Sequence, residues 1–129
     1  MIFLDTNFFI NFFVKENQDH KRSVEIAKTI ENREKVISNL VLNEVVSVLN
    51  LKIKMDKEKI KEIYHYLKNN FIVIEDNYLF DNAVEKIVFY DERMSFRDCI
   101  YLSIMEDLEI KEIVSFDKHF EGKGIIRIH

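Results

Sequence analysis

The chain has 129 residues, of which 47% are hydrophobic and 33% charged, and its formal net charge at pH 7 is −4. These values are typical of a globular protein and exclude an extended disordered chain. Because phosphate contacts favour basic surfaces, the negative charge argues mildly against a nucleic-acid partner, although bound cations reverse the local sign of an acidic cluster.

The scarcity of chain breakers predicts a single domain over residues 1–129, since two glycines and no proline leave no obvious linker. The one cysteine, Cys99, cannot form an internal disulfide, which suits a reducing compartment. No apolar run approaches the roughly 20 residues needed to cross a bilayer. The first residues also lack the basic segment and cleavage site of a signal peptide. We therefore expect a cytoplasmic protein without a membrane segment.

A buried strand that ends at an acid is predicted by the first seven residues, MIFLDTN. Met1 to Leu4 run without a polar break, as in a strand covered by helices on both faces of its sheet. Thr6 or Asn7 can cap the helix that follows, whose phenylalanines form a wide apolar face. We expect this face to pack into the core, with contact to a partner chain as the alternative. Asp5 thus stands at the carboxyl end of a strand, where ligands collect in open parallel sheets.

Strands and helices then alternate along the chain. Helical spacing of apolar residues predicts helices over 19–32, 40–54, 56–70, 77–90 and 95–108. Short apolar runs predict strands over 35–37, 71–74, 113–115 and 125–129. We expect the strand at 71–74 to be buried and the strand at 125–129 to lie at an edge of the sheet. The order predicts an α/β fold of three layers, α/β/α, around a mainly parallel sheet of about 4–5 strands.

Three later acids occupy positions that call for an explanation. Glu44 interrupts an apolar helix, and a buried carboxylate is costly unless it is paired or binds a metal, although it can also point to solvent. Asp98 opens a helix after Ser95, in a sequence similar to a capping box. Asp117 follows an apolar strand as Asp5 does, or caps the turn at 118–120. We expect these acids to meet Asp5 and hold a divalent metal, because parallel crossovers bring strand ends together.

Other catalytic chemistries find no support in the sequence. No phosphate-binding glycine loop is present, and the four histidines lack zinc-ligand spacing. Carboxylates select hard cations such as Mg²⁺ and Mn²⁺. A site of this kind can align a phosphodiester, activate a water and stabilise the leaving oxygen.

The order of these motifs resembles that of the PIN-domain nucleases. The matching features are LDTN at the amino terminus, Glu44 in an apolar helix, Asp98 at a helix start, and S-x-D-x-x-F at 115–120. The chain is most similar to the VapC-type toxins of bacterial and archaeal toxin–antitoxin modules. The resemblance implies a PIN-like fold and an Mg²⁺- or Mn²⁺-dependent endoribonuclease that leaves 5′-phosphate and 3′-hydroxyl ends. It also implies a homodimer that a cognate antitoxin inhibits by inserting near the site.

The resemblance also assigns roles to individual residues. The metal-binding and catalytic acids would be Asp5, Glu44, Asp98 and Asp117, supported by Thr6, Asn7 and Ser115. Substrate contacts would come from Arg93, Arg97, Lys118 and His119, with ordinary surface charges as the alternative for the basic residues. His119 stands where many members carry a further acid, and this departure bears on whether a second metal binds.

Other functions remain open at this stage. The chain is either the toxin of a type II toxin–antitoxin pair or a housekeeping RNA-processing nuclease of the same fold. A PIN-like module that only binds RNA or protein is a further alternative. Such a module would not need to keep four acids whose clustering is energetically unfavourable. The least favoured alternative is an aspartate phosphatase or phosphoacceptor domain, because that class requires a second Asp at the position that Asn7 occupies.

Overall fold

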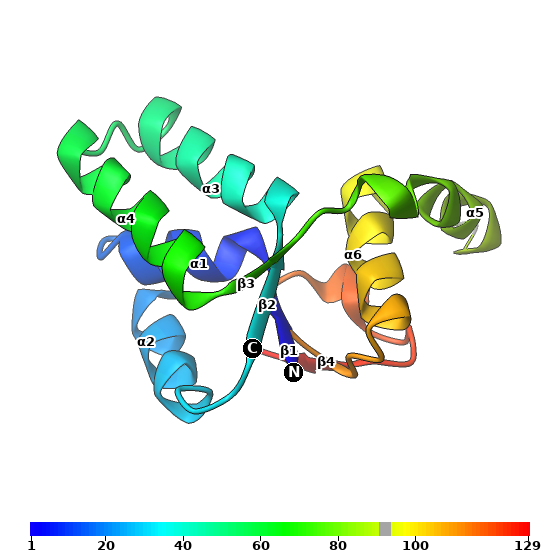
Figure 1. The fold of residues 1–129 in the computed structure, drawn as a ribbon. Coiled ribbons are helices and arrows are strands. Elements are labelled where there is room, and N and C mark those ends of the chain that lie inside the picture. The colour runs from blue at the N-terminus through cyan, green and yellow to red at the C-terminus, as the bar shows by residue number, and fades with distance from the viewer. Residues whose placement is uncertain (91–93) are drawn as a thin grey trace.

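The computed structural model describes residues 1–90 and 94–129, drawn in Figure 1. The described strands are β1 (Ile2–Leu4), β2 (Lys35–Ser38), β3 (Ile72–Ile74), β4 (Glu112–Val114) and β5 (Ile126–Ile128). The described α-helices are α1 (Thr6–Phe13), α2 (His20–Thr29), α3 (Asn39–Leu51), α4 (Lys57–Asn70), α5 (Phe80–Tyr90) and α6 (Phe96–Asp107). Two short 3₁₀ helices are η1 (Asn77–Leu79) and η2 (Lys118–Phe120).

The strands form one sheet in the order β3-β2-β1-β4-β5, and every pairing between neighbours is parallel. At its centre, Phe3 pairs with Val36 on one side and with Ile113 on the other. Figure 1 shows α1 to α4 on one side of the sheet and α5 and α6 on the other. The prediction of a three-layer α/β fold with a mainly parallel sheet of four to five strands is therefore confirmed.

The central strands are buried because helices cover both of their faces. Every residue of β1 is fully buried, as the unbroken apolar run predicted, although Met1 itself is exposed. The phenylalanines of α1 divide between two environments: Phe8 and Phe9 are buried in the core, whereas Phe12 and Phe13 are half-buried. The wide apolar face of this helix is thus mostly core, with one margin reaching the surface.

One expectation about the strands is wrong. The strand at 71–74 was expected to be buried, yet β3 lies at an edge of the sheet and Ile72 remains 41% exposed. An edge strand has a neighbour on only one side, and an apolar run of this length does not reveal that difference. The strand expected at the edge, by contrast, is there: β5 pairs only with β4 at the opposite end of the sheet.

The predicted helix at 77–90 begins with the 3₁₀ turn η1 and continues as α5. The polar turn predicted after it falls mainly on residues 91–93, outside the described residues. Within the described part of the chain, no helix is both long and apolar enough to cross a membrane.

Candidate metal centre at the carboxyl edge of the sheet

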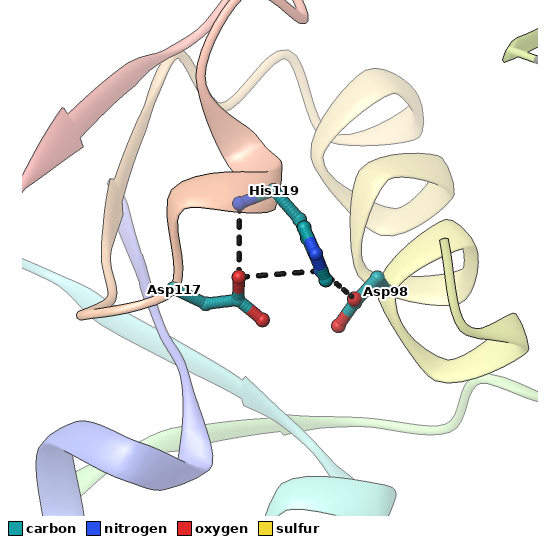
Figure 2. Close-up of side chains that lie close together, drawn as sticks. All are labelled: Asp98, Asp117 and His119. Carbon is teal, nitrogen blue, oxygen red and sulfur yellow. Dashed lines mark hydrogen bonds and ion pairs between the residues drawn. The ribbon is translucent and has the colours of Figure 1, made fainter. Parts of the chain in front are cut away.

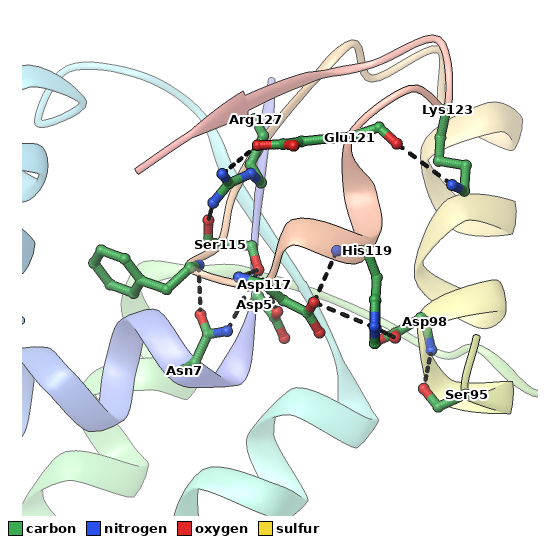
Figure 3. A network of polar contacts seen from close by, with 11 residues as sticks. Asp5, Asn7, Ser95, Asp98, Ser115, Asp117, His119, Glu121, Lys123 and Arg127 are labelled. Carbon is green, nitrogen blue, oxygen red and sulfur yellow. Dashed lines mark hydrogen bonds and ion pairs between the residues drawn. The ribbon is translucent and has the colours of Figure 1, made fainter. Parts of the chain in front are cut away.

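Asp5 lies directly after β1 and forms the buried floor of the candidate site (Figure 3). Its Oδ1 accepts a hydrogen bond from the Thr6 backbone N–H at 2.7 Å, and its Oδ2 accepts one from the Ser115 hydroxyl at 2.6 Å. The residue is only 5% exposed. Burial raises the pKa of Asp5 to about 6, because these two hydrogen bonds offset only part of the loss of solvation.

Ser115 connects Asp5 to the loop after β4 (Figure 3). While its hydroxyl donates to Asp5, its Oγ accepts from the Asp117 N–H at 3.0 Å and from the Asn7 side-chain amide at 3.4 Å. Asn7 also accepts a hydrogen bond from the Phe116 N–H at 3.1 Å. These contacts join the start of α1 to the end of β4 and fix the position of Asp117. The supporting positions predicted for Asn7 and Ser115 are thus beside the acids.

Asp98 reaches the same edge from the first turn of α6. Ser95 caps this helix, since its Oγ accepts from the Asp98 N–H at 3.0 Å. The capping interpretation therefore holds through the backbone of Asp98, and the buried carboxylate of Asp98 lies beside His119 and Asp117 (Figure 2). Burial and the negative charge of Asp117 both raise the pKa of Asp98.

Asp117 and His119 complete the outer part of the site. Asp117 caps η2, because its Oδ1 accepts from the His119 N–H at 2.9 Å. This turn brings the His119 Nδ1 to 3.3 Å from Asp117 Oδ1 and 3.7 Å from Asp98 Oδ2 (Figure 2). One ligand atom from each of these three residues lies within 4.8 Å of the others. Among the described residues they form a group compact enough to hold a metal ion.

Glu44 and Asp5 both lie outside this compact group, and Glu44 forms an ion pair with Arg97 of α6. Both side chains are partly exposed, at 30% for Glu44 and 42% for Arg97. Burial alone would lower the pKa of Arg97, but the carboxylates of Glu44 and Asp5 raise it above its usual value. Arg97 was predicted to contact substrate, and in this structure its guanidinium pairs with Glu44, one of the predicted metal ligands.

Comparison with known proteins assigns the family. The model of the PIN domain matches residues 2–125, which is nearly the whole chain. The chain belongs to the PIN domain family. A comparison with curated proteins found no match.

Solved structures agree with the PIN assignment at the level of the fold. The VapC20 toxin of Mycobacterium tuberculosis, described as cleaving the sarcin–ricin loop, has a TM-score of 0.85 at 21% identity, covering 100% of this chain and 99% of that one. A toxin–antitoxin complex from Klebsiella pneumoniae has a TM-score of 0.71 at 19% identity, covering 98% and 96%. The VapBC2 complex of Rickettsia felis, bound to promoter DNA, has a TM-score of 0.68 at 17% identity, covering 99% and 98%.

Tyr101 is a residue of this PIN domain that the sequence analysis did not connect with the site. It is fully buried one turn along α6 from Arg97, and its ring lies 5.0 Å from that of Phe3. Burial raises the pKa of its hydroxyl, and the nearby charge of Asp5 raises it further. The only sequence signal was its spacing of four residues from Arg97, which in an apolar helix also fits a core aromatic.

A groove of about 430 Å³ opens beside the ion pair, between α3 and the start of α6. It is lined by Glu44 and Arg97 and by two aromatic rings, Phe80 and Phe96, whose centroids are 5.4 Å apart. Phe96 is partly exposed. Of the other predicted substrate contacts, Lys118 is exposed on η2 and Arg93 lies outside the described residues.

The donor set of this PIN domain fits a divalent cation. Its carboxylates come from β1, α6 and the loop after β4, and such oxygens suit Mg²⁺ and Mn²⁺. The raised pKa of Asp5 shows that its negative charge is under-compensated by the protein alone. A bound cation would compensate this negative charge.

Proposed function

We propose that this PIN domain is a single-domain, metal-dependent endoribonuclease and the toxin of a type II toxin–antitoxin pair. The observation that carries the proposal is the compact group in which one ligand atom each of Asp98, Asp117 and His119 lies within 4.8 Å of the others. The buried carboxylate of Asp5 is outside that group, but it is close enough for the negative charge of Asp98 to contribute to its raised pKa. Two of these acids have raised pKa values, which marks a site where negative charge is concentrated without an equivalent counter-charge. Family membership makes phosphodiester hydrolysis the natural use of such a site.

In this proposal the acids act as metal ligands. A divalent ion held by Asp5, Asp98 and Asp117, with Glu44 as a further ligand, would supply Lewis acidity and a more acidic water. Cleavage to 5′-phosphate and 3′-hydroxyl ends requires water to attack phosphorus while the bond to the 3′ oxygen breaks. The protein's part is to hold these groups in line: Ser115 fixes the orientation of Asp5 through its 2.6 Å hydrogen bond.

Arg97 and the groove beside it are the proposed contacts for RNA. A guanidinium can bind phosphate oxygens in a bidentate manner, so Arg97 can exchange Glu44 for a substrate phosphate. The exposed ring of Phe96 offers a surface on which an unpaired base can stack. Lys118 and Arg93 are further candidate phosphate contacts, and His119 was proposed with them from the sequence.

An antitoxin and a second copy of the chain are the proposed protein partners. The structural neighbour from Klebsiella pneumoniae is described as a toxin–antitoxin complex, and the one from Rickettsia felis as VapBC2 bound to promoter DNA. In this chain an apolar groove of about 450 Å³ lies between α1, α2 and α4. A separate apolar face is exposed on α5, formed by Val84, Ile87, Val88 and Phe89. Large exposed apolar surfaces of this type are characteristic of protein interfaces.

A cytoplasmic location remains a prediction.

The first test is cleavage of a mixed RNA pool by the purified protein with Mg²⁺, with Mn²⁺ or with EDTA. We expect metal-dependent cleavage by the wild type and none by Asp5→Asn or Asp98→Asn. Asp76→Asn is the matched control, because Asp76 is also a buried acid near the strand ends but bonds the α3 amide of Leu40 at 3.4 Å. Failure of the folded wild type to cleave RNA or bind metal in calorimetry would instead indicate a non-catalytic binding module.

A growth assay separates a toxin from a housekeeping nuclease. Induced expression of the wild type is expected to arrest growth of the host, and expression of Asp5→Asn is not. A small gene beside this one, whose product binds the chain and restores growth, would identify the antitoxin. Cleavage without any growth arrest would favour the housekeeping role.

A further inference from the structure

The η2 turn places an imidazole among the acids of the candidate metal centre. Because Asp117 caps this turn through the His119 N–H, the histidine side chain folds back over the Asp117 carboxylate (Figure 2). Its Nδ1 faces both Asp117 and Asp98, at 3.3 and 3.7 Å from their nearest carboxylate oxygens. The position of the ring is thus a direct consequence of the Asp-x-His spacing.

These separations are close to those of ligands that share one metal ion. Metal–ligand bonds of about 2.1 Å put neighbouring ligands of an octahedral ion about 3.0 Å apart and opposite ligands about 4.2 Å apart. The three ligand atoms here all lie within 4.8 Å of one another. Movements of a few tenths of an ångström, within the freedom of a side chain that is 55% exposed, would bring the imidazole nitrogen into coordination.

We propose that His119 is a metal ligand through Nδ1, and that it makes this centre a mixed nitrogen–oxygen site that favours Mn²⁺ over Mg²⁺. The inference deepens the proposed function and rests on it. It assigns His119 to the metal, whereas the sequence analysis assigned it to the substrate.

The expected selectivity follows from ligand chemistry. Mg²⁺ takes oxygen ligands almost exclusively and keeps several of its waters, so an imidazole adds little to its binding. Imidazole suits the first-row transition metals, among which Mn²⁺ also accepts carboxylates. An imidazole ligand in place of a further carboxylate also lowers the negative charge of the site. This weakens the binding of Mg²⁺, which relies on electrostatic attraction to oxygen ligands.

The test measures metal binding directly, without RNA. Mn²⁺ is added to the purified wild type, and pulsed electron paramagnetic resonance detects whether a ¹⁴N nucleus is coupled to the bound ion. Calorimetric titrations with Mn²⁺ and with Mg²⁺ then give the ratio of the two dissociation constants. The same measurements are made on His119→Gln, on His119→Asp and on the control His65→Gln, whose histidine is exposed on α4.

We expect histidine nitrogen coupling in the wild type and in His65→Gln, and its loss in both His119 variants. His119→Gln should weaken Mn²⁺ binding by on the order of tenfold with a much smaller effect on Mg²⁺. His119→Asp should move the preference towards Mg²⁺, because it restores an all-oxygen donor set.

Bound Mn²⁺ without nitrogen coupling, or an unchanged Mn²⁺/Mg²⁺ ratio in His119→Gln, would overturn the inference and leave the nuclease proposal standing if RNA is still cleaved. A wild type that binds neither ion would overturn both proposals.

Discussion

The two halves of the acidic centre are built in different ways. The inner half consists of Asp5, Asn7 and Ser115, joined by hydrogen bonds from neutral donors between the ends of two adjacent strands. Asp5 and Ser115 are both buried, so each donor and acceptor has little freedom to choose another partner. This half is set in position before any ligand arrives.

The outer half consists of Glu44, Arg97, Asp117 and His119, where Glu44 forms an ion pair with Arg97 and the His119 Nδ1 lies 3.3 Å from Asp117 Oδ1. Partly exposed ion pairs contribute little to stability and exchange partners readily. The site therefore combines a fixed buried acid, Asp5, with an outer half whose charged groups can change partners. Substitutions in the inner half should therefore have larger effects on both activity and stability than substitutions in the outer half.

The largest effect is expected from Asp5→Asn, which removes the buried charge and preserves the shape of the side chain. Loss of a metal ligand at the reacting centre costs several kcal/mol of transition-state stabilisation, or roughly a thousandfold in rate. Single-turnover cleavage of RNA measures this. A residual rate within tenfold of the wild type, with Asp76→Asn unchanged as control, would show that Asp5 is not essential to the chemistry.

The same variant should be more stable than the wild type when metal is absent. Since burial raises the pKa of Asp5 from the ordinary 3.8 to about 6, the folded state holds the proton more tightly than the unfolded state. Stability should then fall as pH rises from about 4 to 6, by as much as about 3 kcal/mol from this group. Asp5→Asn should remove this fall in urea unfolding measured in EDTA. Parallel stability curves for the two proteins between pH 4 and 7 would contradict the prediction.

Ser115→Ala should have the next largest effect. The substitution leaves the buried Asp5 carboxylate without its 2.6 Å donor and frees the Asp117 N–H, which lowers stability by about 1–3 kcal/mol. Loss of a residue that orients a ligand should also reduce metal affinity about 10–100-fold.

Calorimetry with Mn²⁺ and urea unfolding measure these two effects. The control is Ser103→Ala, since this buried hydroxyl donates within α6, to the Cys99 carbonyl at 2.9 Å. Equal metal affinity in the two alanine variants would remove Ser115 from the site.

The smallest effect is expected at the rim, from Arg97→Gln. Breaking its partly exposed pair with Glu44 should change the free energy of unfolding by less than about 1 kcal/mol. If Arg97 contacts a phosphate, the variant should bind RNA more weakly. The slope of log affinity against log salt concentration should also become shallower by about one. Binding of RNA at several salt concentrations, in Ca²⁺ to prevent cleavage, checks this. An unchanged slope would limit Arg97 to its pairing with Glu44.

Local sequence patterns were sufficient for most of the architecture and for the inner half of the site. An unbroken apolar run predicted β1 as a buried strand, and its end placed Asp5 at the carboxyl edge of the sheet. The cap at Ser95 was legible as well, because its hydroxyl oxygen accepts the Asp98 N–H in the first turn of α6. The cap predicted at Thr6 or Asn7 is wrong: Asp5 caps α1, and both residues lie inside the helix. Such signals are local, because each depends on side chains within a few residues of one another.

Tertiary packing decided the rest. The edge position of β3, and with it the exposure of Ile72, depends on which strands pair, and an apolar run carries no information about its neighbours. The pairing of Glu44 with Arg97 joins residues 53 positions apart, and the approach of His119 to Asp98 joins two separate helices. These distances depend on how the elements pack in the folded chain. In the outer half of the site, they determine which polar side chains lie in contact.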